Sequence, residues 1–276
     1  MCCKSIKKIL LIVFFALISW LNANANELYF IDAHSQVDHN VVPINKVISL
    51  MDSADVSQTI LSTRGNLKGK TLLGLSNENP GRIIPAVRTK GKPYDTASKK
   101  YYEILSKQIT TKQYHAMAEV LLYHAKKGNR APEVIVYPDD KRVQVVLNYA
   151  IEKGWPFIVH IEFASLYGEK RKKFMRAFKQ MLNQHPEQPF ILTHMGQLSR
   201  NRCLRLIKSH KNVYFQTGWT NPVAVESSNQ PWTNVFEGNH LAPEWKVLFI
   251  QYPQRFIFAL DNIFTEHWSD FFIESK

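Results

Sequence analysis

KRVQVVLNYAIEKG at residues 141–154 is followed by FIVHIE at 157–162, EKRKKFMRAFKQMLNQ at 169–184 and FILTH at 190–194. The first and third segments have apolar residues at helical spacing, and the second and fourth are continuous apolar runs. In the segment 169–184, one helical stripe contains Phe174, Phe178, Met181 and Leu182. Continuous apolar runs are typical of strands that are buried on both faces of a parallel sheet. The stretch therefore predicts helices that alternate with parallel strands.

The same alternation extends in both directions along the chain. Further apolar runs lie at 28–33, 59–63, 82–87, 117–123, 213–217 and 256–260. Further amphipathic segments lie at 43–54, 95–108, 199–209 and 243–252. Eight strands alternating with helices predict an α/β fold, a (β/α)8 TIM barrel, with a minimal final helix because only 15 residues follow Asp261. The alternative is an open doubly wound sheet, but no Gly-rich phosphate-binding sequence follows the first strand.

Residues 1–25 have the pattern of a secretory signal peptide. Three lysines (4, 7 and 8) precede an apolar run from Ile9 to Leu21, and Ala23-Asn24-Ala25 offers small residues for cleavage. The apolar run is shorter than the ~20 residues that span a bilayer, although an uncleaved anchor is the alternative. We therefore expect a single domain over residues 26–276 that is periplasmic or secreted and has no stable membrane anchor after cleavage.

Composition narrows the class of protein. The chain is 45% hydrophobic and 21% charged, which excludes collagen-like, disordered and disulfide-scaffold proteins. Cys203 is the only cysteine after residue 25, so no internal disulfide is expected. The net charge of +12 favours acidic substrates or partners. The basic run at 169–179 flanks the apolar stripe and is explained by a solvated helix face, so no nucleic acid is expected as a partner. The sequence does not indicate an oligomeric state.

Several predicted strands contain or lead to residues that bind metals in other proteins. These residues are His34, Gln36, Glu119, His124, His160, His194 and Asp261. In a TIM barrel the chemistry takes place at the C-terminal ends of the strands, where such side chains converge. A single histidine is more often a hydrogen-bonded core residue, but imidazoles together with a carboxylate suit zinc or a similar divalent ion. Such an ion lowers the pKa of a bound water toward ~7, and a nearby carboxylate can accept its proton.

This ordered set resembles the amidohydrolase superfamily, and within it the amidohydrolase-related (amidohydrolase 2) group of metal-dependent TIM-barrel hydrolases. The matching sequences are Asp32-Ala33-His34, residues 156–160, residues 191–196 and Leu260-Asp261-Asn262. The resemblance implies that His34 and His160 bind one or two divalent ions, with zinc expected. It also implies that Asp261 is a ligand or the general base, and that His194 is a ligand or an electrophile beside the metal.

Glu119 and Gln36 each leave alternatives open. Glu119 is similar to the strand-borne glutamate that bridges metals in TatD-like deoxyribonucleases, or it pairs with an Arg or Lys inside the barrel. The family's first strand usually offers His-x-His, whereas this chain has His34-Ser35-Gln36. The amide oxygen of Gln36 is a poorer zinc ligand than imidazole, so the metal binds weakly, is a harder ion, or has been lost. Asp38 and His39 lie close enough in sequence to compensate.

Arg64 and Arg88 follow neighbouring predicted strands. Their guanidinium groups suit a substrate carboxylate or phosphate, or else they pair with carboxylates of the barrel. His124 and Trp219 complete the expected substrate-binding set. The long segment 218–240, which includes Trp219, Trp232 and Phe236, is expected to form a lid over the mouth.

The leading hypothesis is a metal-dependent hydrolase of the amidohydrolase type. It would cleave an amide, ester or lactone bond in a small anionic substrate, or decarboxylate it. The first alternative is a catalytically degenerate barrel that binds a small ligand, favoured by Gln36. The second is a TatD-like nuclease, favoured by Glu119 and the net charge.

Overall fold

The computed structural model describes residues 30–38, 43–127, 131–226, 228, 230–262 and 267. The expected signal peptide at 1–25 lies outside these residues. So does His39, which lies close enough in sequence to compensate for Gln36. No helix in the described part of the chain is long and apolar enough to cross a membrane.

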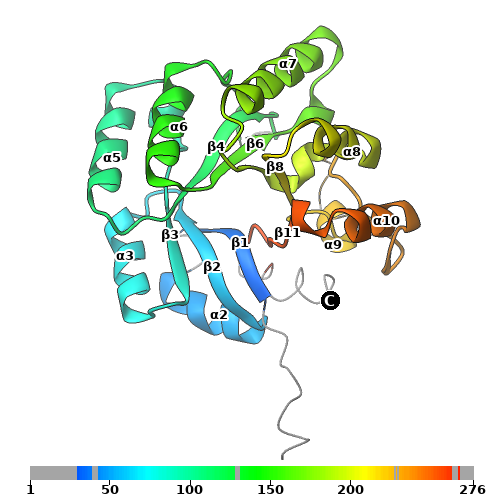
Figure 1. Ribbon diagram of the computed structural model, residues 1–276. Helices are drawn as coiled ribbons and strands as arrows, with labels where there is room; N and C mark the ends of the chain where they lie inside the picture. Colours follow the sequence, from blue (N-terminus) through cyan, green and yellow to red (C-terminus); the bar gives the residue numbers. More distant parts are fainter. Residues whose placement is uncertain are drawn as a thin grey trace, which may run out of the picture.

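Eight parallel strands form a nearly closed barrel with helices around its outside, so the predicted TIM barrel is confirmed (Figure 1). In their spatial order the strands are β1 (Phe30–Val37), β2 (Val56–Thr63), β3 (Ile83–Val87), β4 (Ala116–His124), β6 (Phe157–Ile161), β7 (Phe190–Leu192), β8 (Val213–Gln216) and β11 (Phe256–Ile257). Each neighbouring pair in this order is parallel. Three short antiparallel strands lie outside the barrel order: β5 (Val134–Ile135), β9 (Phe236–Glu237) and β10 (His240–Leu241).

The chain after β11 closes the barrel against β1. The backbone N–H of Ala33 donates to the carbonyl of Phe258 at 3.1 Å, and the N–H of Gln36 donates to the carbonyl of Asn262 at 2.9 Å. The N–H of Asp261 donates in turn to the carbonyl of His34 at 2.8 Å. These hydrogen bonds continue the parallel pairing beyond β11 and bring Asp261 beside His34.

The helices mostly follow the sequence pattern. They are α2 (Val47–Ser53), α3 (Gly69–Glu78), α4 (Lys92–Asp95), α5 (Lys99–Thr110), α6 (Lys141–Lys153), α7 (Gly168–Gln184), α8 (Arg200–Ser209), α9 (Pro222–Glu226) and α10 (Pro243–Gln251). Short 3-10 turns are η2 (Ile44–Lys46), η3 (Phe163–Ser165), η4 (Thr193–Gln197) and η5 (Pro253–Arg255). The single helix expected at 95–108 is two helices, because Ala97 between them has a left-handed φ of 51°. The segment 218–240 contains α9 and β9 as well as loop.

The apolar stripe of α7 packs into the core as predicted, since Phe174, Phe178, Met181 and Leu182 are all buried. A smaller cluster of residues from four adjacent strands consists of Ala86, Ala116, Ala118, Ile158 and Ile191. Side chains alternate along a strand, so Ile158 and His160 of β6 share one face. His160 therefore lies beyond this apolar cluster, toward the C-terminal end of the strand.

Two glycines give a matched test of backbone conformation. Gly154 ends α6 with a left-handed φ of 63°, while Gly74 lies within α3, and a methyl group at either position would have open space. We expect Gly154→Ala to lower the free energy of unfolding by about 1 kcal/mol, because L-residues are strained in this region. We expect Gly74→Ala to raise it by roughly 0.5–1 kcal/mol. Urea unfolding measures both, and shifts of the same sign would contradict this account.

Candidate metal centre

Five of the residues singled out from the sequence converge at the C-terminal end of the barrel. They are His34 in β1, Glu119 in β4, His160 in β6, His194 after β7 and Asp261 after β11. None of these residues is more than 4% exposed. Because they come from five different strands or strand ends, the barrel itself holds them together.

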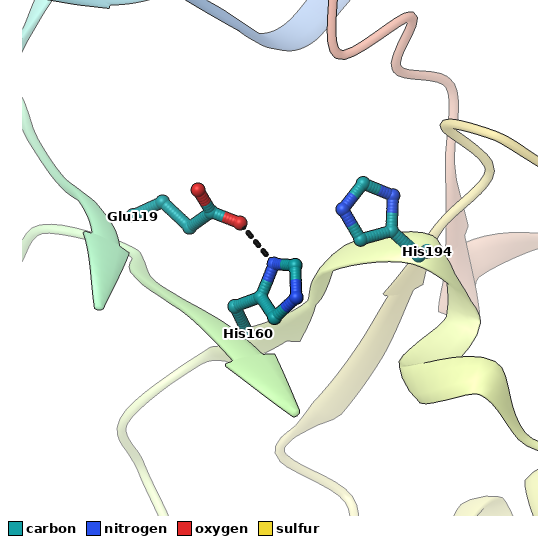
Figure 2. Close-up of side chains that lie close together, drawn as sticks. All are labelled: Glu119, His160 and His194. Carbon is teal, nitrogen blue, oxygen red and sulfur yellow. Dashed lines mark hydrogen bonds and ion pairs between the residues drawn. The ribbon is translucent and has the colours of Figure 1, made fainter. Parts of the chain in front are cut away.

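Glu119, His160 and His194 form the first candidate metal-binding group (Figure 2). One donor atom from each lies within 4.8 Å of the other two. Oε1 of Glu119 contacts Nδ1 of His160, and the rings of His160 and His194 are 4.9 Å apart between centroids. Two imidazoles and one carboxylate are a donor set that suits zinc, so these buried residues could hold a metal ion.

Asp261 lies between two of the histidines. Its Oδ1 is 3.4 Å from Nε2 of His34, and its Oδ2 is 3.4 Å from Nε2 of His194. Nε2 of His34 is also 4.0 Å from Oε2 of Glu119. His34 and Asp261 thus adjoin the first group. Burial raises the pKa of Asp261 above its ordinary value.

The amide of Gln36 reaches the two carboxylates of the centre. Its Nε2 donates to Oδ1 of Asp261 at 2.9 Å and to Oε2 of Glu119 at 3.4 Å. Its Oε1 is buried and has no hydrogen-bond partner among the described residues. The amide nitrogen therefore takes the position in which the sequence placed an oxygen ligand. Rotation of the amide group would exchange the two atoms.

Lys90 is a residue of the centre that the sequence analysis missed. It follows β3, and its Nζ contacts Oε2 of Glu119. Burial would raise the pKa of Glu119, but the charges of Lys90 and His160 hold that pKa well below its usual value. Glu119 thus has the lysine partner that was one of the two expectations. Its role as a metal ligand stays a prediction, although it lies beside His160. The position of Lys90 after a strand end was the signal that could have identified it.

Glu162, directly after β6, is the second residue that was missed. Its Oε1 is 3.0 Å from Nε2 of His160 and 2.8 Å from Nζ of Lys127, and its Oε2 accepts the N–H of Ala125 at 2.7 Å. Burial disfavours protonation of His160, but Glu119 and Glu162 together raise its pKa to about 9. His124, His160 and Glu162 form a second candidate metal-binding group. Strand alternation, which places His160 and Glu162 on one face, was the available signal.

The other imidazoles of the centre are neutral at neutral pH. Burial, with the charge of His160 adding to it, lowers the pKa of His194 to about 3 and that of His124 to about 3. Burial also lowers the pKa of His34. Nδ1 of His194 lies 3.2 Å from the carbonyl of Gly218. If the proton is on Nδ1, Nε2 has a lone pair free for a metal.

The residues expected to bind substrate are only partly brought to this centre. His124 is close, with its ring centroid 5.3 Å from that of His160. Arg88, in contrast, donates from Nη1 to the carbonyl of Gly65 at 2.7 Å and from Nε to that of Lys90 at 3.2 Å. Nε of Arg64 is 3.9 Å from a carboxylate oxygen of Asp38. The two guanidinium groups thus have partners within the chain.

Two indoles pack over the centre from the segment 218–240. Trp219 donates from Nε1 to the carbonyl of Asp261 at 3.3 Å. The ring centroid of Trp232 is 5.4 Å from that of Trp219 and 4.9 Å from that of His194. Nζ of Lys127 lies 4.6 Å from the centre of the Trp232 ring. These contacts explain why so little of the centre is exposed.

Comparisons with known proteins support the fold. No protein-family model matches the chain, and no curated protein matches it. One similar solved structure is an uncharacterized TIM-barrel protein from Bordetella bronchiseptica, with a TM-score of 0.57 and 12% identity over 89% of this chain and 91% of that one. Another is a dihydroorotase from Campylobacter jejuni, with a TM-score of 0.52 and 12% identity over 84% of this chain and 69% of that one.

Proposed function

We propose that the protein is a metal-dependent hydrolase of the amidohydrolase type. It would act on an amide, ester or lactone bond in a small anionic substrate, or decarboxylate it, and would be periplasmic or secreted. The observation that carries this proposal is the buried convergence of Glu119, His160 and His194, with Asp261 3.4 Å from His194. The fold-level likeness to a dihydroorotase is consistent with the same reaction class but adds no residue to it.

Each residue of the centre has a role in this proposal. Glu119, His160 and His194 would hold a divalent ion, with zinc as the expected metal, and His34 adjoins them. Such an ion would supply Lewis-acid activation of the scissile carbonyl and of water. Asp261 would accept a proton from the attacking water at a carboxylate oxygen and pass it to the leaving group. The raised pKa of Asp261 makes its carboxylate a better base toward water. The protonated carboxyl group can then donate that proton to the leaving group.

A second candidate function is a degenerate barrel that binds a small ligand without catalysis. It is favoured by the Gln36 amide and the Lys90 ammonium, because both already satisfy carboxylates of the centre without a metal. The nuclease alternative has less support. Glu119 favours it, but among the described residues Trp219 and Trp232 pack over the centre, which disfavours access for a polymer.

Metal content tests the leading proposal. We expect near-stoichiometric divalent metal by mass spectrometry in mature protein purified without chelators. His160→Ala should lose the metal, because both candidate groups contain this residue. His115→Ala, at an exposed position, is the matched control and should keep it. Protein that stays free of metal after reconstitution would favour the ligand-binding barrel. Metal in the wild type would justify a screen of esters, lactones and amides.

A further inference from the structure

A cavity of about 590 Å³ lies beside the candidate metal centre. Its walls come from the end of η4, the first residues of α8, the segment 231–234 and the first residues of α10. The lining residues include the polar side chains of Gln197, Arg200 and Glu244 and the indoles of Trp232 and Trp245. Trp232 lines the cavity and also packs on His194 with 4.9 Å between ring centroids. Trp232 thus contacts both the cavity and a residue of the centre.

Two residues that line the cavity, Gln197 and Arg200, each have a buried hydrogen-bond donor without a partner among the described residues. Gln197 is only 4% exposed, and its Oε1 accepts from Oγ of Ser165 at 3.1 Å while its Nε2 is unpaired. Nε of Arg200 is likewise buried and unpaired, although its Nη1 donates to Oδ1 of Asn201 at 3.1 Å. A buried donor without an acceptor is costly, so an acceptor from outside the chain would stabilise both.

The N-terminal end of α8 is a third source of donors in the same wall. The helix has 10 residues, and the side chain of its N-cap residue, Ser199, makes no capping hydrogen bond. The first N–H groups of a helix lack partners within the helix, and the helix dipole favours negative charge at this end. Donors from Gln197, Arg200 and α8 therefore all favour an anionic acceptor.

We propose that this cavity binds the carboxylate of a small organic acid whose aromatic or alicyclic body packs against Trp232 and Trp245. A guanidinium group and a helix N-terminus suit a carboxylate. Glu244, which also lines the cavity, disfavours a second negative group, so a monoacid fits best. The assignment of this acid as the substrate rests on the proposed function, but its binding does not.

Calorimetric titration tests the site with two defined probes, phenylacetate and its uncharged counterpart phenylacetamide. We expect the acid to bind and the amide to bind at least tenfold more weakly. Arg200→Gln should weaken binding of the acid by about tenfold or more, the usual scale for a charge-assisted hydrogen bond. Arg200→Lys keeps the charge and should restore part of that loss. Arg205→Gln removes an exposed arginine of the same helix and should leave the affinity unchanged.

The possible outcomes separate this proposal from the hydrolase assignment. Equal affinity for acid and amide, no binding of either, or unchanged binding in folded Arg200→Gln protein would overturn the site. His160→Ala, which removes the metal ligand, should still bind phenylacetate. Binding that persists in a protein without metal or hydrolytic activity would uphold the site and refute the hydrolase. Metal and hydrolysis without binding would refute only the site.

Discussion

Replacing Asp261 with Asn is expected to lower kcat by about a hundredfold to ten-thousandfold, the range that a positioned acid–base group contributes. The oxygens of Asp261 lie 3.4 Å from His34 and His194, so the carboxylate is next to the proposed reaction site. Asn has the same shape but cannot accept the proton from water. It also tolerates the left-handed φ of 48° at this position better than most residues. The fold and the metal content should therefore be unchanged.

The measurement is steady-state kinetics on the best substrate from the ester, lactone and amide screen, alongside metal analysis of the same samples. Asp52→Asn is the matched control, because Asp52 forms a surface ion pair with Arg82 at 2.6 Å, away from the centre. It should keep full activity. Retained activity in Asp261→Asn would refute the role as base. Lost metal would instead make Asp261 a ligand.

The sequence predicted most of the barrel because apolar runs and amphipathic segments report directly on burial. Helix α6 has the bounds that its pattern predicts, and α7 begins one residue earlier than expected. Helix α3 was missed, since Gly69 and Gly74 weaken its helical pattern. A closed barrel implies that the last expected strand, at 256–260, pairs with the first, but the register of this pairing was out of reach. It depends on backbone hydrogen bonds that no residue pattern specifies.

The residues predicted for the candidate centre lie on the expected strands or directly after them, whereas Lys90 lies farther along the loop that follows β3. His34, Glu119 and His160 are strand residues, and the fold brings them together. The place of Lys90 after β3 makes it a candidate, but its side chain is a flexible four-carbon chain, so strand spacing does not predict that it contacts Glu119. The orientation of the Gln36 amide depends on the charged groups around it. The sequence therefore could not predict that its nitrogen, and not its oxygen, faces Glu119 and Asp261.

Replacing Glu162 with Gln is expected to weaken zinc binding by about tenfold to a hundredfold, the usual effect of removing the carboxylate behind a histidine ligand. Glu162 lies 3.0 Å from Nε2 of His160, and Nδ1 faces Glu119. In a metal-bound centre Glu162 would accept a hydrogen bond from Nε2, which would leave the lone pair of Nδ1 for the ion. The Glu162 carboxylate also favours a proton on Nδ1 of His160, and that proton competes with the metal. A divalent ion carries twice the charge of a proton, so the carboxylate stabilises the bound metal more than the bound proton. Removing the carboxylate therefore weakens metal binding.

Competition with a chromogenic chelator measures this affinity. Glu133→Gln removes a half-exposed carboxylate that contacts Lys170 and Tyr123, and as the matched control it should bind zinc like the wild type. Unchanged affinity in Glu162→Gln would show that Glu162 only ties Lys127 and Ala125 to the barrel mouth. If Glu162→Gln loses the metal entirely while His194→Ala keeps it, the ion belongs to the second group instead. In that group Glu162 is itself a ligand, together with His124 and His160.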